Sequence, residues 1–295
     1  MNALVFGPNG LIGAHLVERL LKEGHKVTGA SRNQKKLFSS SKYNHISIDI
    51  SKKEEFKKLK GDYDIIFNLA AHIATGYSTD EAEDCLLINA LGTLHILEFT
   101  VEKKIERLIH SSSVTVYGKP KRRIAYEKSP TNPIIVYGVS KLTSEMYCNM
   151  YSELHGLKIT ILRCSPVYGL GMSQETALPI FIEKARKNEE IALYGDGMRN
   201  QDYVYVDDVV EANMLAAEKK VTGVFNIGSG TKTTMKYLAE TIVDVFDSSS
   251  KIFYDPNRAQ EFSIGIDIAK ARKTLGYEPK YDIKSGLQQY RSFTK

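Results

Sequence analysis

The chain has 295 residues, of which 42% are hydrophobic, and its 40 basic and 35 acidic residues give a formal net charge of +5. This length and apolar content support a large core, as one big domain or as one domain with a smaller partner. The charge is spread along the sequence, which argues against nucleic-acid binding and membrane binding. Three cysteines without a CxxC pair argue against a disulfide framework or a thiolate metal site. We therefore expect a cytoplasmic protein with no metal, signal peptide or membrane span.

The first residues predict a strand, a tight turn and a helix. An apolar run from Ala3 to Phe6 is followed by Gly7, Gly10 and Gly13 and then by apolar residues at helical spacing. Gly7 is expected to make the turn, Gly10 to let a ligand approach the backbone, and Gly13 to let the helix pack on the strand. The helix N-terminus favours an anion, so the turn predicts a pyrophosphate site, although such turns are also ordinary connections. The residues expected to line this site are Gly7, Asn9, Gly10, Leu11, Ile12 and Gly13.

The first half of the chain alternates short apolar runs with helical patterns. This alternation predicts an α/β fold with a Rossmann-type, doubly wound parallel sheet. The expected strands are 3–6, 26–30, 45–48, 64–71, 107–110 and 158–163, and the longest expected helices are 80–103 and 137–155.

The residues at or just after the ends of three of these strands are candidates for cofactor contacts. Ser31 and Arg32 follow the second strand, where an NAD site usually has an acid and an NADP site an arginine, so the sequence favours NADP over NAD. Asp49 with Ile50 follows the third strand, where the carboxylate is either an adenine contact or a turn residue. Leu69, Ala70 and Ala71 end the fourth expected strand, where the small alanines let a cofactor pass closely, and His72 beyond them is a candidate substrate contact.

A tyrosine and a lysine share one face of the helix that opens near residue 137. Tyr137 and Lys141 are four residues apart, and a lysine ammonium beside a phenol favours the phenolate. The pair therefore predicts a tyrosine that acts as a general base. The serine-rich strand end at 111–113 lies upstream, at the sheet edge where the glycine turn places the cofactor.

Ten segments in order give the chain a resemblance to the extended short-chain dehydrogenase/reductases, the nucleoside-diphosphate-sugar epimerase/dehydratase family. The segments are GPNGLIG at 7–13, DI at 49–50, NLAA at 68–71, NALGT at 89–93, SSSVTVYG at 111–118, YGVSK at 137–141, LRCSPVYG at 162–169, YGDGMRNQDYVYVDDV at 194–209, NIGSG at 226–230 and LGYEP at 275–279. The resemblance implies that Ser113, Tyr137 and Lys141 are catalytic, that Lys141 also binds the nicotinamide ribose, and that Asn89 orders the site.

The same resemblance implies a smaller domain that closes over a nucleotide sugar. We expect a dinucleotide-binding domain at 1–165 plus about 202–228, and a substrate domain at about 166–201 and 229–295. A pyrophosphate-bearing substrate needs arginines, and Arg199 and Arg258 are the candidates. Where the family commonly has an arginine the chain has Gln201, and Pro166 replaces a family asparagine, so the substrate's identity stays open. Thr115 is a further candidate substrate contact, and Pro166 a candidate cofactor contact.

The reaction that these residues could catalyse, once dehydration is excluded, is oxidoreduction at a sugar carbon. The dehydratase branch carries two acids where this chain has Val114 and Thr115, so dehydration is not expected. Family frequency favours an epimerase with a transient keto sugar, whereas the residues at 31–32 favour an NADPH-dependent ketoreductase. A non-catalytic NADP-binding sensor is the alternative of another class, and it usually lacks the tyrosine or lysine. By resemblance we also expect a homodimer packed through the 80–103 and 137–155 helices.

Overall fold

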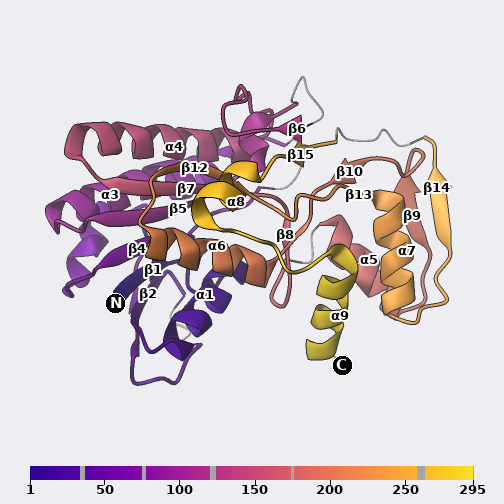
Figure 1. Cartoon of the computed structure of the whole chain (residues 1–295), viewed down its shortest axis with the longest axis horizontal. Helices are drawn as coiled ribbons and strands as arrows, with labels where there is room; N and C mark the ends of the chain where they lie inside the picture. The colour runs from indigo at the N-terminus through magenta and orange to yellow at the C-terminus, as the bar shows by residue number, and fades with distance from the viewer. Residues whose placement is uncertain (34–36, 75–77, 120–123, 174–175, 258–262, 295) are drawn as a thin grey trace.

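A computed structural model describes residues 1–33, 37–74, 78–119, 124–173, 176–257 and 263–294. Seven parallel strands form its central sheet in the order β12-β7-β5-β4-β1-β2-β3 (Figure 1). Their bounds are β1 (Asn2–Phe6), β2 (Lys26–Ser31), β3 (Tyr43–Ser47), β4 (Ile65–Asn68), β5 (Arg107–Ser113), β7 (Lys158–Cys164) and β12 (Gly223–Ile227). The strand order reverses between β1 and β4, so the predicted Rossmann-type sheet is confirmed.

Helices cover both faces of the sheet because successive strand residues point to opposite sides. Ala3 and Val5 belong to one apolar core, and Leu4 and Phe6 belong to the other. The first core is covered by α1 (Leu11–Lys22), α6 (Val206–Lys219) and α8 (Ala269–Leu275). The second lies under α3 (Gly92–Glu102) and α4 (Val136–His155), which Figure 1 shows on the side of the sheet away from α1 and α6.

The helix expected at 80–103 is a continuous helical run of three parts. These are α2 (Ala82–Cys85), a π-helical turn η2 (Leu86–Leu91) and α3. The π-helical turn contains Asn89, and such turns occur frequently at functional sites. By length and composition the run is apolar enough to cross a membrane, yet 56% of its most apolar window is buried inside the protein, as expected of a core helix.

Three strands differ from the sequence-based expectation by two or more residues at one end. Strand β3 begins at Tyr43 because it pairs with β2 from that residue onward. Strand β4 ends at Asn68, since Leu69 to Ala71 leave the sheet beside the glycine turn. Strand β5 continues to Ser113, which pairs with Cys164 of β7. The serine-rich segment is therefore part of the sheet.

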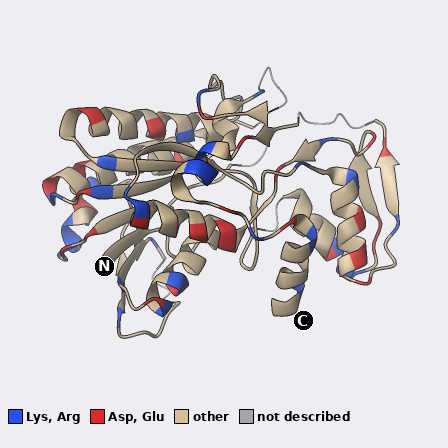
Figure 2. Ribbon diagram, in the orientation of Figure 1, with Lys and Arg blue, Asp and Glu red and all other residues tan. Residues whose placement is uncertain are grey.

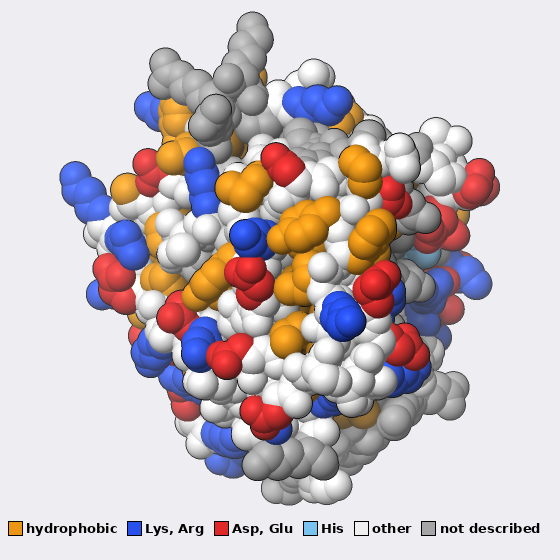
Figure 3. Space-filling view, turned by 90° about the vertical axis from the view of Figure 1, so that its right-hand side faces the viewer, with side chains coloured by type: hydrophobic (Ala, Val, Ile, Leu, Met, Phe, Trp, Pro, Cys, Tyr) orange, Lys and Arg blue, Asp and Glu red, His pale blue; other side chains and the backbone are white. Residues whose placement is uncertain are grey.

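A smaller lobe lies beyond the carboxyl edge of the sheet and has its own apolar core. It is built from α5 (Ala177–Arg186), α7 (Met235–Val245), α9 (Ile283–Phe293), β9 (Ile191–Tyr194) and β14 (Ile252–Asp255). Figure 3 shows hydrophobic side chains interspersed with charged ones on its outer face. Short pairs join β8 (Val167–Tyr168) to β11 (Val204–Tyr205), β10 (Asn200–Gln201) to β13 (Thr233–Thr234), and β6 (Ile124–Ala125) to β15 (Gly265–Ile266). Short 3-10 helices lie at η1 (Lys53–Lys58) and η3 (Val114–Tyr117).

The division into two domains stays a prediction, and one observation refines it. Helix α8 packs on β12 and α6, and Ile266 and Leu275 belong to the first core. These residues were expected in the substrate domain, but they pack with the dinucleotide-binding sheet. Acidic and basic side chains are spread over both parts (Figure 2).

Candidate active site

The glycine turn joins β1 to α1 at the point where the strand order reverses. Gly7 has a φ of +79°, and a Cβ there would lie 2.8 Å from the backbone nitrogen of Ala70. A Cβ on Gly13 would lie 2.0 Å from the carbonyl oxygen of Gly7, so the helix can start this close to the turn only with glycine. A Cβ on Gly10 would meet its nearest neighbour, Gly7 O, at an ordinary 3.6 Å. These environments fit the three separate tasks expected from the sequence.

The candidate adenosine end of the site lies where β2 and β3 end. The amide of Asn9 donates to Ser31 Oγ over 3.1 Å, and Ser31 Oγ is also 3.0 Å from a ring nitrogen of His45. Arg32 follows on the surface with an exposed side chain. Asp49 Oδ1 accepts hydrogen bonds from the backbone nitrogen and hydroxyl of Ser51, so its carboxylate is a turn residue as well as a candidate adenine contact. Ile50 packs against Gly92, where a Cβ would lie 2.7 Å from its side chain.

Asn89 ties the loop after β4 to the helix that carries the tyrosine. Its Oδ1 accepts from the backbone nitrogen of His72 and its Nδ2 donates to the carbonyl of His72, both at 2.8 Å. The same Nδ2 lies 2.8 Å from Ser140 Oγ on α4. The His72 ring itself pairs with Glu81. Asn89 therefore orders this edge through three contacts, and Leu69, Ala70 and Ala71 lie between it and the glycine turn.

The end of β5 lies against the first turn of α4. A Cβ on Gly138 would lie only 2.8 Å from the carbonyl oxygen of Thr115, which places η3 beside the turn that holds Tyr137. Ser113 Oγ accepts hydrogen bonds from the backbone nitrogen of Thr115 at 3.2 Å and from its hydroxyl at 3.0 Å. A hydroxyl that accepts two bonds still has one hydrogen to donate. The structure thus brings Ser113, Thr115, Tyr137 and Lys141 to one edge of the sheet.

Burial opposes the charge effect expected between Tyr137 and Lys141. It lowers the pKa of the Lys141 ammonium to about 8 and raises the pKa of the Tyr137 phenol above its ordinary value. Both charged forms are therefore costly in this environment. The charge of Lys141 therefore does not bring the pKa of Tyr137 below its ordinary value in this environment.

A buried ion pair, which the sequence analysis missed, holds α4 against the sheet. Glu145 and Arg163 are 2.6 Å apart, and their side chains are only 2% and 7% exposed. Ser112 donates to Glu145, and Arg163 also donates to the hydroxyl of Tyr117. The sequence did contain a signal for Glu145: it lies four residues after Lys141, which places it one helical turn further along the same face of α4.

The remaining candidates are the cofactor contact Pro166 and the substrate contacts Arg199, Gln201 and Arg258. Pro166 follows β7, and its carbonyl accepts from the backbone nitrogen of Val204 over 3.0 Å. Gln201 lies in β10, which pairs with β13, and Arg199 precedes that strand. Arg258 lies outside the described residues.

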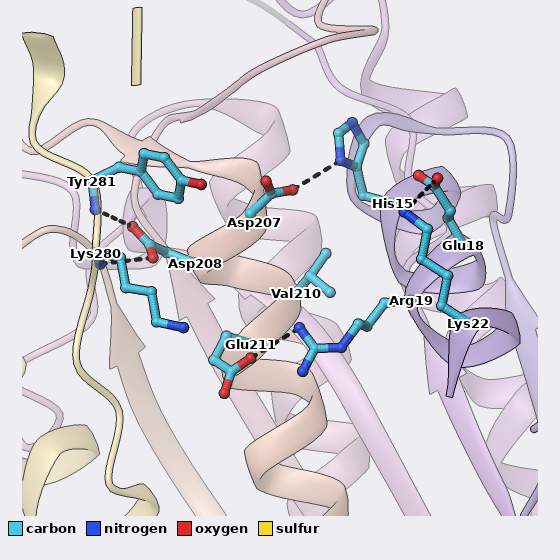
Figure 4. Close-up of a pocket in the computed structure, with 10 residues that line it drawn as sticks. All are labelled: His15, Glu18, Arg19, Lys22, Asp207, Asp208, Val210, Glu211, Lys280 and Tyr281. Atoms are coloured by element: carbon cyan, nitrogen blue, oxygen red, sulfur yellow. Dashed lines mark hydrogen bonds and ion pairs between the residues drawn. The ribbon is translucent and has the colours of Figure 1, made fainter. Parts of the chain in front are cut away.

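His15 on α1 contacts α6 and the carbonyl oxygen of Leu170 at the edge of a cavity of about 260 Å³ (Figure 4). Its Nδ1 is 3.0 Å from Asp207 on α6, and its Nε2 is 3.0 Å from the carbonyl oxygen of Leu170. Two acceptors at the two ring nitrogens favour the imidazolium, which has two N–H donors. Burial lowers the pKa of His15, but the bonds to Asp207 and Leu170 outweigh it, so the net shift is upward.

This contact predicts a pH-dependent contribution to stability. Because the pKa of folded His15 is raised above 6.5, its stabilisation is complete below that value and is lost as the pH rises through the folded pKa. The replacement His15→Gln should therefore lower the free energy of unfolding at pH 5.5, and by less at pH 8.5, where less of His15 is protonated. We expect a loss of only about 1 kcal/mol at pH 5.5, because the Asp207 carboxylate is partly exposed to solvent. Denaturant titration at both pH values measures this difference. A loss that is equal at both would refute the ion pair.

Comparison with known proteins shows the family to which the chain belongs. The model of the NAD dependent epimerase/dehydratase family matches residues 3–228. A putative UDP-glucose 4-epimerase of Methanocaldococcus jannaschii is 32% identical over 305 residues, covering 99% of this chain and 98% of that protein.

Two solved structures share the whole architecture. The UDP-glucose 4-epimerase of Thermotoga maritima, solved with UDP-glucose, superposes with a TM-score of 0.91 at 30% identity and full coverage of both chains. The UDP-glucuronic acid 4-epimerase of Bacillus cereus, solved with UDP-glucuronic acid and NAD, has a TM-score of 0.89 at 27% identity, with 99% of this chain and 98% of that one covered. With the family model matching most of the chain and a relative above 30% identity spanning nearly all of it, the chain belongs to the NAD dependent epimerase/dehydratase family of enzymes.

Proposed function

We propose that this protein is an NAD(P)-dependent epimerase that inverts one carbon of a nucleoside diphosphate sugar through a transient keto intermediate. The observation that carries the proposal is the contact between the end of β5 and the first turn of α4. It brings Ser113 and Thr115 next to the helix turn of Tyr137 and Lys141. The glycine turn, with its helix N-terminus, lies at the same carboxyl edge of the sheet.

We assign a different role in the reaction to each of the side chains of Tyr137, Ser113 and Lys141. Tyr137 takes the hydroxyl proton, and Ser113 donates a hydrogen bond to the same oxygen. Lys141, one helical turn after Tyr137 on α4, would bind the nicotinamide ribose and contribute positive charge near the phenol. An oxidised nicotinamide, when bound, would supply the hydride acceptor and further positive charge. Because burial raises the pKa of Tyr137, we expect proton transfer to depend on the dinucleotide being bound.

The substrate class follows from the relatives and from the residues of the smaller lobe. The solved neighbours were obtained with UDP-glucose or UDP-glucuronic acid, which supports a UDP-hexose here. Arg199 and Gln201 are the proposed contacts to its pyrophosphate and sugar, with Arg258 as a second arginine, and His72 and Thr115 are proposed as further contacts to the substrate. The neutral residues Val114 and Thr115 supply no carboxylate for water elimination, which supports epimerisation over dehydration.

A substrate panel tests the proposal. Purified protein is incubated with UDP-, GDP-, CDP- and dTDP-sugars and their 4-keto forms while the absorbance of NADPH and the sugar products are followed. Isomerised sugar without consumption of NADPH is the expected result. Stoichiometric consumption of NADPH would identify a ketoreductase, and tight dinucleotide binding without turnover of any sugar would identify a non-catalytic binding protein.

We further propose that the bound dinucleotide is NADP rather than NAD. Neutral Ser31 and exposed Arg32 lie at the end of β2, next to the position expected for a 2'-phosphate. The side chain of Ser31 is hydrogen-bonded to Asn9 and His45. The replacement Arg32→Ala should raise the Kd for NADPH about 10- to 100-fold, the loss of a charged hydrogen bond, and leave that for NADH within threefold. Fluorescence titration measures both constants. Arg19→Ala, which removes an exposed arginine at the far end of α1, is the control. An unchanged Kd for NADPH would exclude the 2'-phosphate contact.

The same site also serves the ketoreductase alternative. A net reductant is usually NADPH, so Arg32 supports a reductase as well as an NADP-dependent epimerase. The two reactions use Ser113, Tyr137 and Lys141 alike, and they differ in whether the hydride returns to the sugar it came from. The absorbance arm of the panel separates them.

We propose a homodimer formed through α4 and the neighbouring helical run, in a cytoplasmic setting consistent with three free, buried cysteines. Val139, Met146 and Met150 are 50%, 65% and 41% exposed and follow helical spacing along α4. The double replacement Met146→Glu and Met150→Glu should convert the dimer to a monomer in analytical ultracentrifugation, because four carboxylates would enter an apolar interface. Phe253→Glu on β14, 48% exposed in the wild type, should leave the dimer intact. A wild-type monomer would contradict this assembly.

A further inference from the structure

A histidine that the proposed reaction does not use lies under the reactive helix. His110 is in β5, three residues before Ser113, and is 0% exposed. One of its ring nitrogens, Nδ1, is 3.2 Å from Asn68 Nδ2, and the other, Nε2, is 2.9 Å from Ser144 Oγ on α4. The ring therefore bridges the sheet and the helix that carries Tyr137.

The hydrogen-bond directions around His110 are determined by its neighbours. Thr93 donates its hydroxyl hydrogen to the carbonyl of Asn89 over 2.6 Å, so the Asn68 atom 3.1 Å from Thr93 Oγ1 must be the amide nitrogen. That nitrogen can only donate, so His110 Nδ1 accepts and Nε2 carries the hydrogen. Burial, and to a smaller extent the nearby charge of Lys141, lower the pKa of His110 well below its ordinary value, which agrees with a neutral ring.

These contacts form a continuous chain of hydrogen bonds that is attached to two successive turns of α4. At one end Ser144 Oγ donates to the carbonyl of Lys141 over 2.7 Å. At the other end Ser140 Oγ donates to the carbonyl of Tyr137 over 2.8 Å and is itself bonded by Asn89. The residues of this chain are Asn68, Thr93, Asn89, His110, Ser140 and Ser144.

We propose that His110 is a positioning residue for the Tyr137 and Lys141 pair. Through Asn68 and Ser144 it fixes the distance of the reactive turn of α4 from the sheet edge where Ser113 and the glycine turn lie. Its neutral form is required, because a protonated Nδ1 would face the Asn68 amide hydrogens. The inference rests on the proposed function, since it concerns proton transfer to Tyr137. A displacement of about 1 Å at a reacting group is enough to cost about 100-fold in rate.

The replacement His110→Phe tests the proposal, because the ring keeps its approximate shape and loses both hydrogen bonds. We expect kcat for the nucleotide sugar to fall about 10- to 100-fold, with KM and the dinucleotide Kd within threefold of wild type. His110→Gln, whose amide nitrogen can donate to Ser144, should recover at least part of kcat. Thr160→Val is the matched control, because Thr160 is also buried and hydrogen-bonded, in neighbouring β7, and its side chain lies on the sheet face opposite to Ile159 and Ile161, which pack under α4.

A second measurement is independent of turnover. Hydrogen exchange of the backbone amides at 137–145 should become at least about 10-fold faster in His110→Phe and stay unchanged in Thr160→Val. Unchanged exchange together with a kcat within threefold of wild type would overturn the positioning role. An equal loss of kcat in Thr160→Val would also overturn it, since the effect would then be general destabilisation. A wild-type protein that turns over no nucleotide sugar would refute the proposed function, whereas the exchange result would still decide whether His110 holds α4.

Discussion

Replacing Tyr137 with phenylalanine is expected to lower kcat by at least about 100-fold, the contribution of a positioned general base. The ring would remain, so the packing of the first turn of α4 should persist and the dinucleotide should still bind. Only the phenolic oxygen is lost, and it is the group that takes the proton from the sugar hydroxyl. Steady-state kinetics with the nucleotide sugar identified by the panel, combined with fluorescence titration of the dinucleotide, separates these two effects.

Tyr147→Phe is the matched control for this experiment. Tyr147 is also on α4, is partly buried, and packs against the second core, away from the end of β5. Its replacement should leave kcat within twofold of wild type. If Tyr137→Phe retained near-normal turnover, the sugar hydroxyl would have to lose its proton to another group and the assignment of the base would fail.

The replacement Gly10→Ala is expected to weaken dinucleotide binding about 10- to 100-fold, the effect of a steric conflict of 1–3 kcal/mol. A Cβ there meets no protein atom closer than 3.6 Å, and the φ of −78° suits alanine, so the fold should be preserved. The new methyl group would instead project where the pyrophosphate approaches the backbone. Thermal unfolding and fluorescence titration measure the two properties independently.

Gly13→Ala is the counterpart with the opposite expectation. Its Cβ would lie 2.0 Å from the carbonyl oxygen of Gly7, so the turn and α1 would have to move apart. The unfolding temperature should fall together with the dinucleotide affinity. Normal affinity in Gly10→Ala would show that the pyrophosphate does not lie on this turn.

Local sequence signals accounted for much of the site because each depends on residues close together in the chain. The glycine spacing at 7–13 predicted a strand, a turn and a helix, and the structure gives each glycine the environment that its task requires. The four-residue spacing of Tyr137 and Lys141 predicted a shared helix face on α4. The alternation of apolar runs predicted the parallel sheet, whose order is confirmed.

Contacts between distant segments could not be predicted in this way. Glu145 meets Arg163 across 18 residues, and His110 meets Asn68 across 42. Nothing in the residues near either partner specifies the other, since the pairing arises from the strand order. Likewise the pKa of Tyr137 was expected to fall because of Lys141, but burial, which depends on the whole fold, raises it.

The central claim, that a hydride leaves the sugar for the bound dinucleotide and returns to the same sugar, can be tested with one labelled substrate. The nucleotide sugar identified by the panel is deuterated at the carbon that is inverted, and the product is examined by mass spectrometry and NMR. We predict that the epimer keeps the deuterium at that carbon, with no net consumption of NADPH. An epimer that carries hydrogen from the solvent at that carbon would contradict the account.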